Sequence, residues 1–158
     1  MTPKIKTNWQ LYTQNLEISY PNMKSWVEEN NSLMNRLRSL ETKIDLVVLD
    51  EQICKHHDKQ MSAEFVVGNL RKILLKSDHN LVFAESFFSQ DVIKEFAKFG
   101  RLEEEPLGKY LFSDSNIKKH ETYIADYELD DQAFLGRKCI YSYNDQKFSV
   151  IEVFLFNE

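Results

Sequence analysis

Residues 65–88, with the sequence FVVGNLRKILLKSDHNLVFAESFF, give the clearest indication of the fold. This stretch contains two apolar runs of strand length, and the cluster Ser77-Asp78-His79-Asn80 separates them. Serine, aspartate and asparagine favour turns because their side chains hydrogen-bond to the nearby backbone. The stretch therefore predicts a β-hairpin, with a long strand over 65–76 and a returning strand over 81–88.

The register of this hairpin places one cation on an apolar surface. Counting outward from the turn puts Arg71 opposite Ser86. Alternate residues of a strand share a face, so Arg71 is expected beside four apolar side chains, those of Ile73, Leu75, Val82 and Ala84. A guanidinium there suits two-point capture of a carboxylate, although a structural ion pair, for example with Glu152, explains it as well. On the other face, Lys72 and Glu85 are expected to form a cross-strand ion pair.

The rest of the chain supplies more strands and several short helices. Strands are expected over 44–50, 116–127, 137–143 and 147–156, the last two joined around Asn144-Asp145. Helices are expected over 21–29, 33–40, 90–99 and 106–112. The polar segment 51–61 is expected to be a loop or flap. Hairpin-connected strands with helices grouped at the start and middle favour an antiparallel α+β fold.

A second charged residue lies within an apolar strand. Glu152 shares one strand face with four apolar side chains, those of Phe148, Val150, Phe154 and Phe156. A carboxyl group that loses hydration favours its protonated form and can donate a proton near neutral pH. The pattern equally allows a core glutamate tied to one basic partner, or a strand edge where Glu152 meets water.

Length and composition limit the classes of protein. The 158 residues, 42% of them hydrophobic, predict one domain over 1–158 with a sizeable core. The net charge of −5 argues against a nucleic-acid partner, whose footprint is usually basic. No stretch approaches the ~20 apolar residues of a membrane span, and no signal peptide is evident. A cytoplasmic location is therefore expected.

Motifs for cofactors, metals and disulfides are missing from the sequence. Cys54 and Cys139 lie far apart and are expected to be reduced thiols. His56, His57 and Asp58 have no further ligands at metal-site spacing, so a solvated loop is expected there rather than a zinc site. Neither a glycine-rich phosphate loop nor a nucleophile elbow occurs, which disfavours a cofactor-dependent enzyme.

Four short segments, in order along the chain, resemble the chorismate pyruvate-lyase family. The first is Trp26 followed by the run from Ser32 to Leu37, and the second is the strand from Leu70 to Leu75 that contains Arg71. The third is Pro106-Leu107-Gly108-Lys109-Tyr110-Leu111-Phe112, similar to the family's Pro-Leu-Gly-Arg/Lys-Tyr-Leu-Phe. The fourth is the terminal strand Ile151-Glu152-Val153-Phe154-Leu155.

The resemblance implies a six-stranded antiparallel sheet with flanking helices and flaps over an internal ligand pocket. It implies conversion of chorismate to 4-hydroxybenzoate and pyruvate without cofactor or metal. It assigns Arg71 to the ring carboxylate and Glu152 to the oxygen at the far side of the ring, with Leu33 and Leu107 lining the pocket. Because losing the enolpyruvyl group makes the ring aromatic, the protein need only hold the substrate, exclude water and assist proton movement.

One departure concerns the second carboxylate of chorismate. The family commonly has a glycine-arginine pair opposite Arg71, where this chain has Glu85 and Ser86. Ser86 therefore joins the expected substrate-binding residues, and the replacement cation is left open among three candidates, Lys55, Lys109 and Arg137. Nearby, Asn31 and Met34 replace the family's glycine and threonine.

Two alternatives to this lyase remain. The same fold serves as the ligand-sensing domain of bacterial repressors, so a non-catalytic sensor of an aromatic acid is one alternative. The other is a related lyase that makes another hydroxybenzoate or acts on a relative of chorismate. A small domain with no obvious apolar stripe to spare is expected to be a monomer. By resemblance, the pathway would be ubiquinone synthesis.

Overall fold

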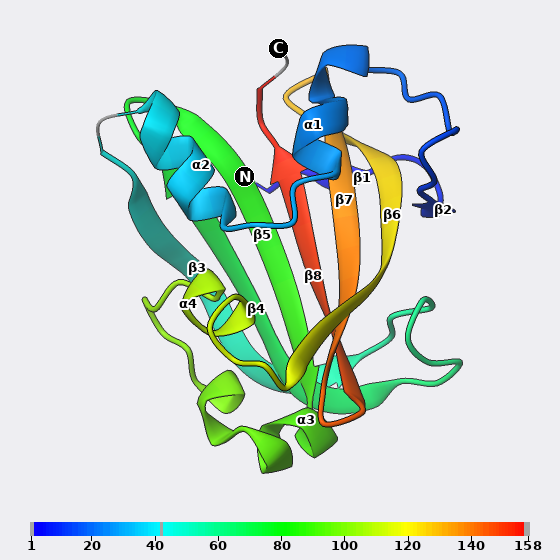
Figure 1. The fold of residues 1–158 in the computed structure, drawn as a ribbon, viewed down its shortest axis with the longest axis vertical. Helices are drawn as coiled ribbons and strands as arrows, with labels where there is room; N and C mark the ends of the chain where they lie inside the picture. Colours follow the sequence, from blue (N-terminus) through cyan, green and yellow to red (C-terminus); the bar gives the residue numbers. More distant parts are fainter. Residues whose placement is uncertain (1, 42, 157–158) are drawn as a thin grey trace.

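The structure is a computed structural model that describes residues 2–41 and 43–156, and it is built on one antiparallel sheet. The strands lie in the order β1-β6-β7-β8-β5-β4-β3, and β2 also pairs with β6 (Figure 1). The strands are β1 (Lys4–Ile5), β2 (Gln10–Leu11), β3 (Asp45–His56), β4 (Val66–Lys76), β5 (Asn80–Ser89), β6 (Ile117–Leu129), β7 (Gln132–Tyr143) and β8 (Gln146–Phe154). The helical segments are η1 (Pro21–Met23), α1 (Lys24–Val27), α2 (Leu33–Leu40), α3 (Gln90–Glu95), η2 (Ala97–Gly100) and α4 (Gly108–Leu111).

The α+β class is confirmed, but the expected number of six strands is wrong. All six predicted strands are present as β3 to β8, and the sheet has eight strands because β1 and β2 are added to it. Each of these two strands has only two residues and pairs with β6. A two-residue strand is too short to show the alternation from which a strand is predicted.

The predicted loop over 51–61 is wrong in its first half. Strand β3 continues to His56, and its second half pairs with β4 from Glu51↔Arg71 to His56↔Val66. The sequence hides this extension because β3 lies at the edge of the sheet, where polar side chains face water. Backbone hydrogen bonds to β4 hold the strand whatever its side chains are.

The hairpin of β4 and β5 is confirmed in the part that matters for the site. Arg71 pairs with Ser86, and Lys72 pairs with Glu85. The side chains of Lys72 and Glu85 form the expected ion pair at 3.9 Å. Since neighbouring residues in a strand face opposite ways, Arg71 points to the other face of the sheet.

Two tight turns connect β6, β7 and β8. Both central residues of each turn, Asp130-Asp131 and Asn144-Asp145, have positive φ angles between 46° and 70°. This is the backbone of a type I′ hairpin turn, which aspartate and asparagine tolerate. The Asn144-Asp145 turn was predicted; the other lengthens β7 to begin at Gln132 rather than at Arg137.

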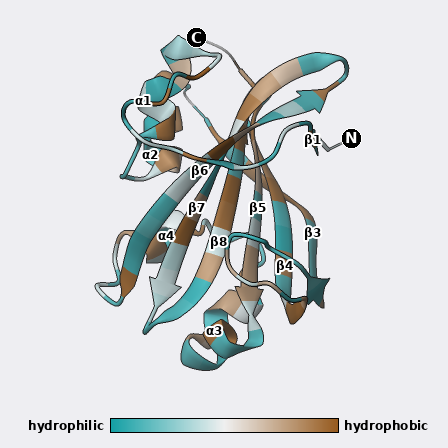
Figure 2. Cartoon of the chain, turned by 90° about the vertical axis from the view of Figure 1, so that its right-hand side faces the viewer, coloured by the Kyte–Doolittle hydropathy of each residue, from teal (hydrophilic) through white to brown (hydrophobic). Residues whose placement is uncertain are grey.

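Helices α1, α2 and α4 lie on one face of the sheet, and α3 lies at one end (Figures 1 and 2). Trp26 of α1 and Leu33 and Leu37 of α2 are buried against Ile73 and Leu75 of β4. The predicted helix over 90–99 is interrupted, because Phe96 leaves the helical conformation between α3 and η2. The helices thus roof one face of the sheet, the face toward which Arg71 points.

Within the described residues, no helix is long and apolar enough to cross a lipid bilayer.

Candidate active site

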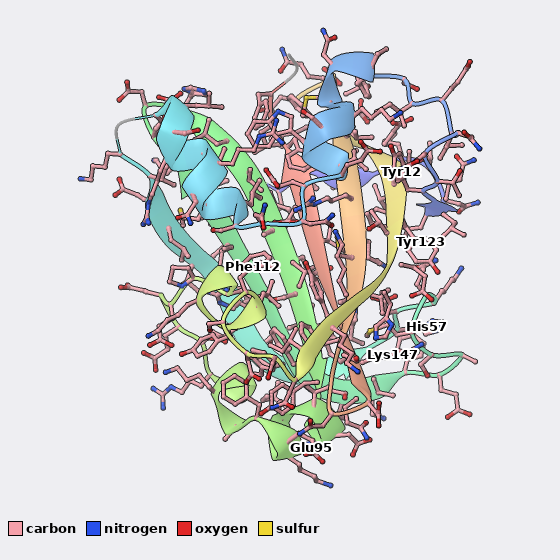
Figure 3. The ribbon with its side chains drawn as sticks, in the orientation of Figure 1. Tyr12, His57, Glu95, Phe112, Tyr123 and Lys147 are labelled. Atoms are coloured by element: carbon pink, nitrogen blue, oxygen red, sulfur yellow. The ribbon has the colours of Figure 1, made fainter. Side chains whose placement is uncertain are left out.

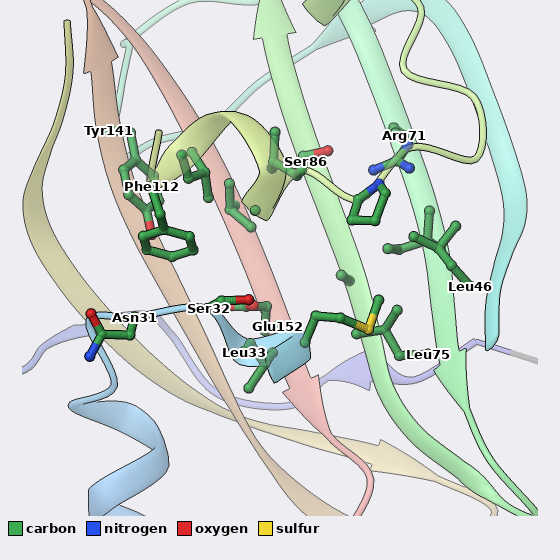
Figure 4. Close-up of a pocket in the computed structure, with 18 of the residues that line it drawn as sticks. Asn31, Ser32, Leu33, Leu46, Arg71, Leu75, Ser86, Phe112, Tyr141 and Glu152 are labelled. Atoms are coloured by element: carbon green, nitrogen blue, oxygen red, sulfur yellow. The ribbon is translucent and has the colours of Figure 1, made fainter. Parts of the chain in front are cut away.

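A cavity of about 70 Å³ lies between the sheet and its helical roof. Its floor comes from β4, β5, β7 and β8, and its roof comes from the segments around α2 and α4 (Figure 4). Its lining is mostly apolar, with Leu33, Ile73, Ala84, Leu107 and Val150 among the side chains. Seven residues with polar side chains interrupt this lining: Asn31, Ser32, Arg71, Ser86, Arg137, Tyr141 and Glu152.

Arg71 is almost completely buried at the wall of the cavity, with 2% of its surface exposed. Its Nη2 donates to the carbonyl oxygens of Glu103 at 2.9 Å and Glu105 at 2.7 Å, in the segment that leads to α4. Its buried Nε has no hydrogen-bond partner within the described residues. Burial lowers the pKa of Arg71, and the carboxylates of Glu51 and Glu105 oppose that effect. Arg71 therefore keeps donor capacity for an anion in the cavity.

Glu152 lies on β8, with β5 between it and the strand of Arg71. Its Oε1 accepts a hydrogen bond from Nε of Arg137 at 2.8 Å, and the two residues are direct cross-strand neighbours. The alternative of a core glutamate tied to one basic partner is thus realised, and the partner is Arg137. The ion pair that the sequence allowed between Arg71 and Glu152 does not form, since Arg71 bonds main-chain carbonyls.

Arg137 joins this ion pair to the roof. Its Nη1 donates to the carbonyl oxygens of Trp26 at 2.8 Å, Val27 at 3.2 Å and Glu29 at 3.0 Å, at the carboxyl end of α1. Burial on its own would lower the pKa of Arg137, but the adjacent Glu152 outweighs that effect and the pKa is raised. Arg137 is thus a permanent cation that anchors α1 and faces Glu152.

The other expected pocket residues also border the cavity. Leu33 comes from α2, Leu107 from the turn before α4, and Ser86 from β5 beside Arg71. Of the three candidates for the missing cation, Arg137 lines the cavity, whereas Lys55 and Lys109 do not. Lys109 is mostly exposed and pairs with Glu105 at 3.6 Å.

Two lining aromatic residues were missed at the sequence level. Tyr141 shares a strand face with Arg137, and burial raises its pKa strongly. Phe112 closes the cavity from the end of α4 (Figures 3 and 4). Alternation along the predicted strand 137–143 placed Tyr141 on the face of Arg137, but nothing local indicated that this face meets Glu152.

The expected solvated loop at His56–Asp58 is wrong for Asp58. This residue is 4% exposed, and its Oδ1 accepts a hydrogen bond from Nζ of Lys138 at 2.9 Å. Lys138 follows Arg137 in β7, so the pair lies on the sheet face away from the cavity. His57 belongs to the same loop, far from Phe112 at the roof (Figure 3). Across residues 2–41 and 43–156, no group of three or more His, Cys, Asp or Glu is arranged to hold a metal ion.

Comparison with known proteins identifies the family of the chain. The sequence profile of the family described as "Chorismate lyase" matches residues 4–158. A probable chorismate pyruvate-lyase of Pseudoalteromonas translucida is 26% identical over 168 residues, covering 96% of this chain and 93% of the relative.

Two further relatives carry the same description. The probable chorismate pyruvate-lyase of Psychromonas ingrahamii is 24% identical, covering 85% of this chain and 82% of its own. That of Pseudoalteromonas atlantica is 26% identical, covering 87% and 82%. With the family profile matched over nearly its whole length, this chain belongs to the chorismate lyase family.

Proposed function

We propose that this chain is a chorismate pyruvate-lyase that converts chorismate to 4-hydroxybenzoate and pyruvate. The observation that carries the proposal is the placement of Arg71 and Glu152 on the wall of one apolar cavity. Membership of the family supports the same conclusion. The proposed role in a pathway, as the first step of ubiquinone synthesis, follows from the resemblance alone.

The cavity suits a flat ring with one polar group at each end. Two strand spacings and two residue steps separate the Cα atoms of Arg71 and Glu152, about 12 Å in all. Two inward-reaching side chains leave room for one six-membered ring between them. In the proposed pose, Nε of Arg71 donates to the ring carboxylate, and Glu152 accepts the hydrogen bond of the ring hydroxyl.

The proposed chemistry balances without an outside reagent. The bond between the ring carbon and the ether oxygen breaks, and a proton leaves the ring carbon that bears the hydroxyl. The departing enolpyruvate takes up one proton at its methylene carbon and becomes pyruvate. The aromatic product supplies the driving force, so positioning and proton transfer are the tasks left to the protein, and no metal or cofactor is required.

The ion pair with Arg137 changes the catalytic role that we assign to Glu152. The sequence led us to expect a protonated carboxyl group that donates a proton. Paired with a guanidinium, the carboxylate acts as a hydrogen-bond acceptor, and we assign it to hold the ring hydroxyl and to accept the proton that leaves the ring carbon bearing that hydroxyl.

The second carboxylate of chorismate needs another partner, because Ser86 stands where the family commonly has arginine. We assign this role to Arg137, whose Nη2 makes no hydrogen bond within the described residues, assisted by the hydroxyl groups of Ser86 and Tyr141.

The roof must also move. A volume of about 70 Å³ holds roughly five waters, less than chorismate requires, so the segments around α2 and α4 open to admit it.

The decisive experiment is to incubate purified protein with chorismate and to follow pyruvate and the aromatic product together. Equal amounts of pyruvate and 4-hydroxybenzoate are expected. Pyruvate released with a different hydroxybenzoate would replace the proposed product by another one. No release of pyruvate at any chorismate concentration would refute the lyase.

A non-catalytic aromatic-acid sensor is the second candidate, and one observation favours it. Nη1 and Nε of Arg137 are already engaged by three carbonyl groups and Glu152, which weakens its capture of a second carboxylate. A ligand with one carboxylate would then suffice. Calorimetry that shows tight binding of 4-hydroxybenzoate by a protein without turnover would establish the sensor instead.

A further inference from the structure

We propose that Glu51 is a positioning residue, which holds the chain segment 102–105 in place so that this segment can fix the guanidinium of Arg71. The inference rests on the proposed function for its ligand, an aromatic carboxylate. It concerns a residue that the sequence placed in a loop, and which lies instead in the middle of β3.

Glu51 and Arg71 lie opposite each other on the adjacent strands β3 and β4. They are direct partners in the ladder between β3 and β4, so their side chains leave the same face of the sheet. The segment that follows η2 passes over this part of the sheet on its way to α4 (Figure 1). Both charged side chains form hydrogen bonds with the backbone of that segment. Glu51 accepts from its N–H groups, and Arg71 donates to its carbonyl groups.

The side chain of Glu51 accepts hydrogen bonds from backbone N–H groups of the segment. Its Oε2 accepts from the backbone N–H of Leu102, and its Oε1 accepts from that of Glu103, both at 2.9 Å. The Nδ2 of Asn69 donates to the same Oε2 and to the carbonyl oxygen of Phe99, each at 2.9 Å. Burial on its own would raise the pKa of Glu51, but the hydrogen bonds from Asn69, Glu103 and Leu102 and the charge of Arg71 lower it.

The side chain of Arg71 donates hydrogen bonds to backbone carbonyl groups of the same segment. Glu103 is bound at both ends of its peptide: its N–H donates to Glu51, and its carbonyl oxygen accepts from Nη2 of Arg71. Its φ angle is +55°, in the left-handed region that a glutamate rarely adopts, and the two contacts stabilise this conformation. If the hydrogen bonds from the segment to Glu51 are lost, the carbonyl groups that orient Arg71 lose their fixed position.

The first test needs no ligand and uses the full chain. In Glu51→Gln, one acceptor oxygen becomes an amide donor that faces a backbone N–H. The amide protons of Leu102 and Glu103 are expected to lose protection from hydrogen exchange, and NMR is expected to show faster rotation of the Arg71 guanidinium. The matched control is Asp50→Asn, since Asp50 is the neighbouring exposed carboxylate and its side chain bonds only Gln52 among the described residues. Unchanged exchange and unchanged guanidinium rotation in Glu51→Gln would overturn the inference.

The second test separates positioning from general damage with a double-mutant cycle. Glu51→Gln is expected to weaken 4-hydroxybenzoate binding about tenfold in the wild-type background. In an Arg71→Ala background the same change is expected to have less than about a twofold effect, because Glu51 acts through Arg71. Equal effects in both backgrounds would show a role independent of Arg71 and overturn the proposal.

The two tests distinguish failure of the proposed function from failure of the inference about Glu51. If the wild-type protein binds no aromatic carboxylate, the proposed function fails, and the exchange and rotation measurements alone decide about Glu51. If Glu51→Gln fails to fold, Glu51→Asp replaces it, because the shorter carboxylate keeps its charge but cannot reach both amides. Wild-type protection at Leu102 and Glu103 in Glu51→Asp would then count against the inference.

Discussion

At the scale of single residues, the cavity contains two guanidinium groups with different tasks. Arg137 bonds Glu152 through Nε and the end of α1 through Nη1, which fixes its orientation and leaves Nη2 for the second carboxylate in our proposal. Arg71 bonds two carbonyls through Nη2 only, and its buried Nε lacks a partner among the described residues. A buried donor without a partner is costly, and a bound carboxylate would remove that cost.

Arg71→Ala is therefore expected to weaken 4-hydroxybenzoate binding by about 100-fold, since a charge-assisted contact is lost. Isothermal titration calorimetry measures this. The control is Lys72→Ala, because Lys72 lies next in β4 but points to the opposite face and pairs with Glu85. An affinity that stays within about twofold of wild type in Arg71→Ala would refute the assignment.

Glu152→Gln is expected to lower kcat with chorismate by about 10²-fold or more, while the affinity for 4-hydroxybenzoate changes less than tenfold. The glutamine keeps an oxygen for Nε of Arg137, so the packing is preserved, but it cannot accept a proton. Steady-state kinetics and calorimetry check the two values. Glu85→Gln, on the opposite face of β5, is the control and is expected to be near wild type; a wild-type kcat in Glu152→Gln would contradict the role.

At the scale of elements, the roof is tied down by a few local bonds. Helix α2 begins at Ser32, whose Oγ accepts from the N–H of Asn35 at 3.2 Å. Helix α3 begins in the same way at Ser89, whose Oγ accepts from the N–H of Val92 at 3.4 Å. Only the first of these two helices contributes residues to the cavity.

This pair of caps gives a matched test of the roof. Ser32→Ala and Ser89→Ala are each expected to cost about 1 kcal/mol of stability, measured by urea unfolding. Only Ser32→Ala is expected to weaken 4-hydroxybenzoate binding, because it loosens the helix that carries Leu33 into the cavity. Equal losses of affinity in the two variants would mean that the roof around α2 has no special part in binding.

A second bond ties the N-terminal segment to α1. The hydroxyl of Tyr12 donates to Oε2 of Glu28 at 2.7 Å, and burial together with Glu28 raises the pKa of Tyr12 to about 12. In the unfolded chain the hydroxyl ionises near 10, so the folded state holds the proton more tightly. The stability from this bond is thus fully present below pH 10 and is lost as the pH rises toward 12.

Tyr12→Phe is expected to lower the midpoint of thermal unfolding at pH 8, and the difference from wild type is expected to shrink between pH 10 and about 12. Scanning calorimetry at several pH values measures it. Tyr143→Phe is a suitable comparison, since no hydrogen bond of its hydroxyl is found in the described residues and its ring keeps the stacking on Phe96. A difference that stays constant with pH would contradict the assignment to this bond.

At the scale of the whole molecule, the two faces of the sheet do different work. One face carries the cavity and its roof. The other is covered in part by the loop after β3, which is held by the buried pair of Asp58 and Lys138. Lys138 also donates to Oε1 of Gln60 at 2.8 Å and lies over the ring of Trp9. Burial lowers the pKa of Lys138, which shows how far the pair is removed from water.

Lys138→Met is expected to destabilise the protein by about 3–5 kcal/mol, because it leaves a buried carboxylate without its partner. The double change of Lys138→Met with Asp58→Leu is expected to recover much of the loss. Lys72→Met is the control: its pair with Glu85 is partly exposed, so a cost below about 1 kcal/mol is expected. Chemical denaturation measures all three, and a cost of Lys138→Met no larger than that of the control would contradict the buried pair.

Local patterns predicted the existence of the six long strands, the β4–β5 register away from the turn and the face on which Arg71 lies. These are local properties: alternation with a period of two residues and turn residues at fixed places. Next to the turn the register shifts, and Lys76 pairs with Asn80 rather than with Leu81. Motif resemblance added the family, and the matched family profile confirmed it.

Apart from the Lys72–Glu85 pair, which the hairpin register predicts, the pairing of charged groups depends on contacts between distant segments. Arg137 binds Glu152 because β7 lies beside β8, and Glu51 reaches the segment before α4 because β3 extends past the predicted loop. The pairing of Asp58 with Lys138 joins residues 80 positions apart. No local pattern carries such information, since the partner of a buried charge depends on strand order and on the path of distant segments across the sheet.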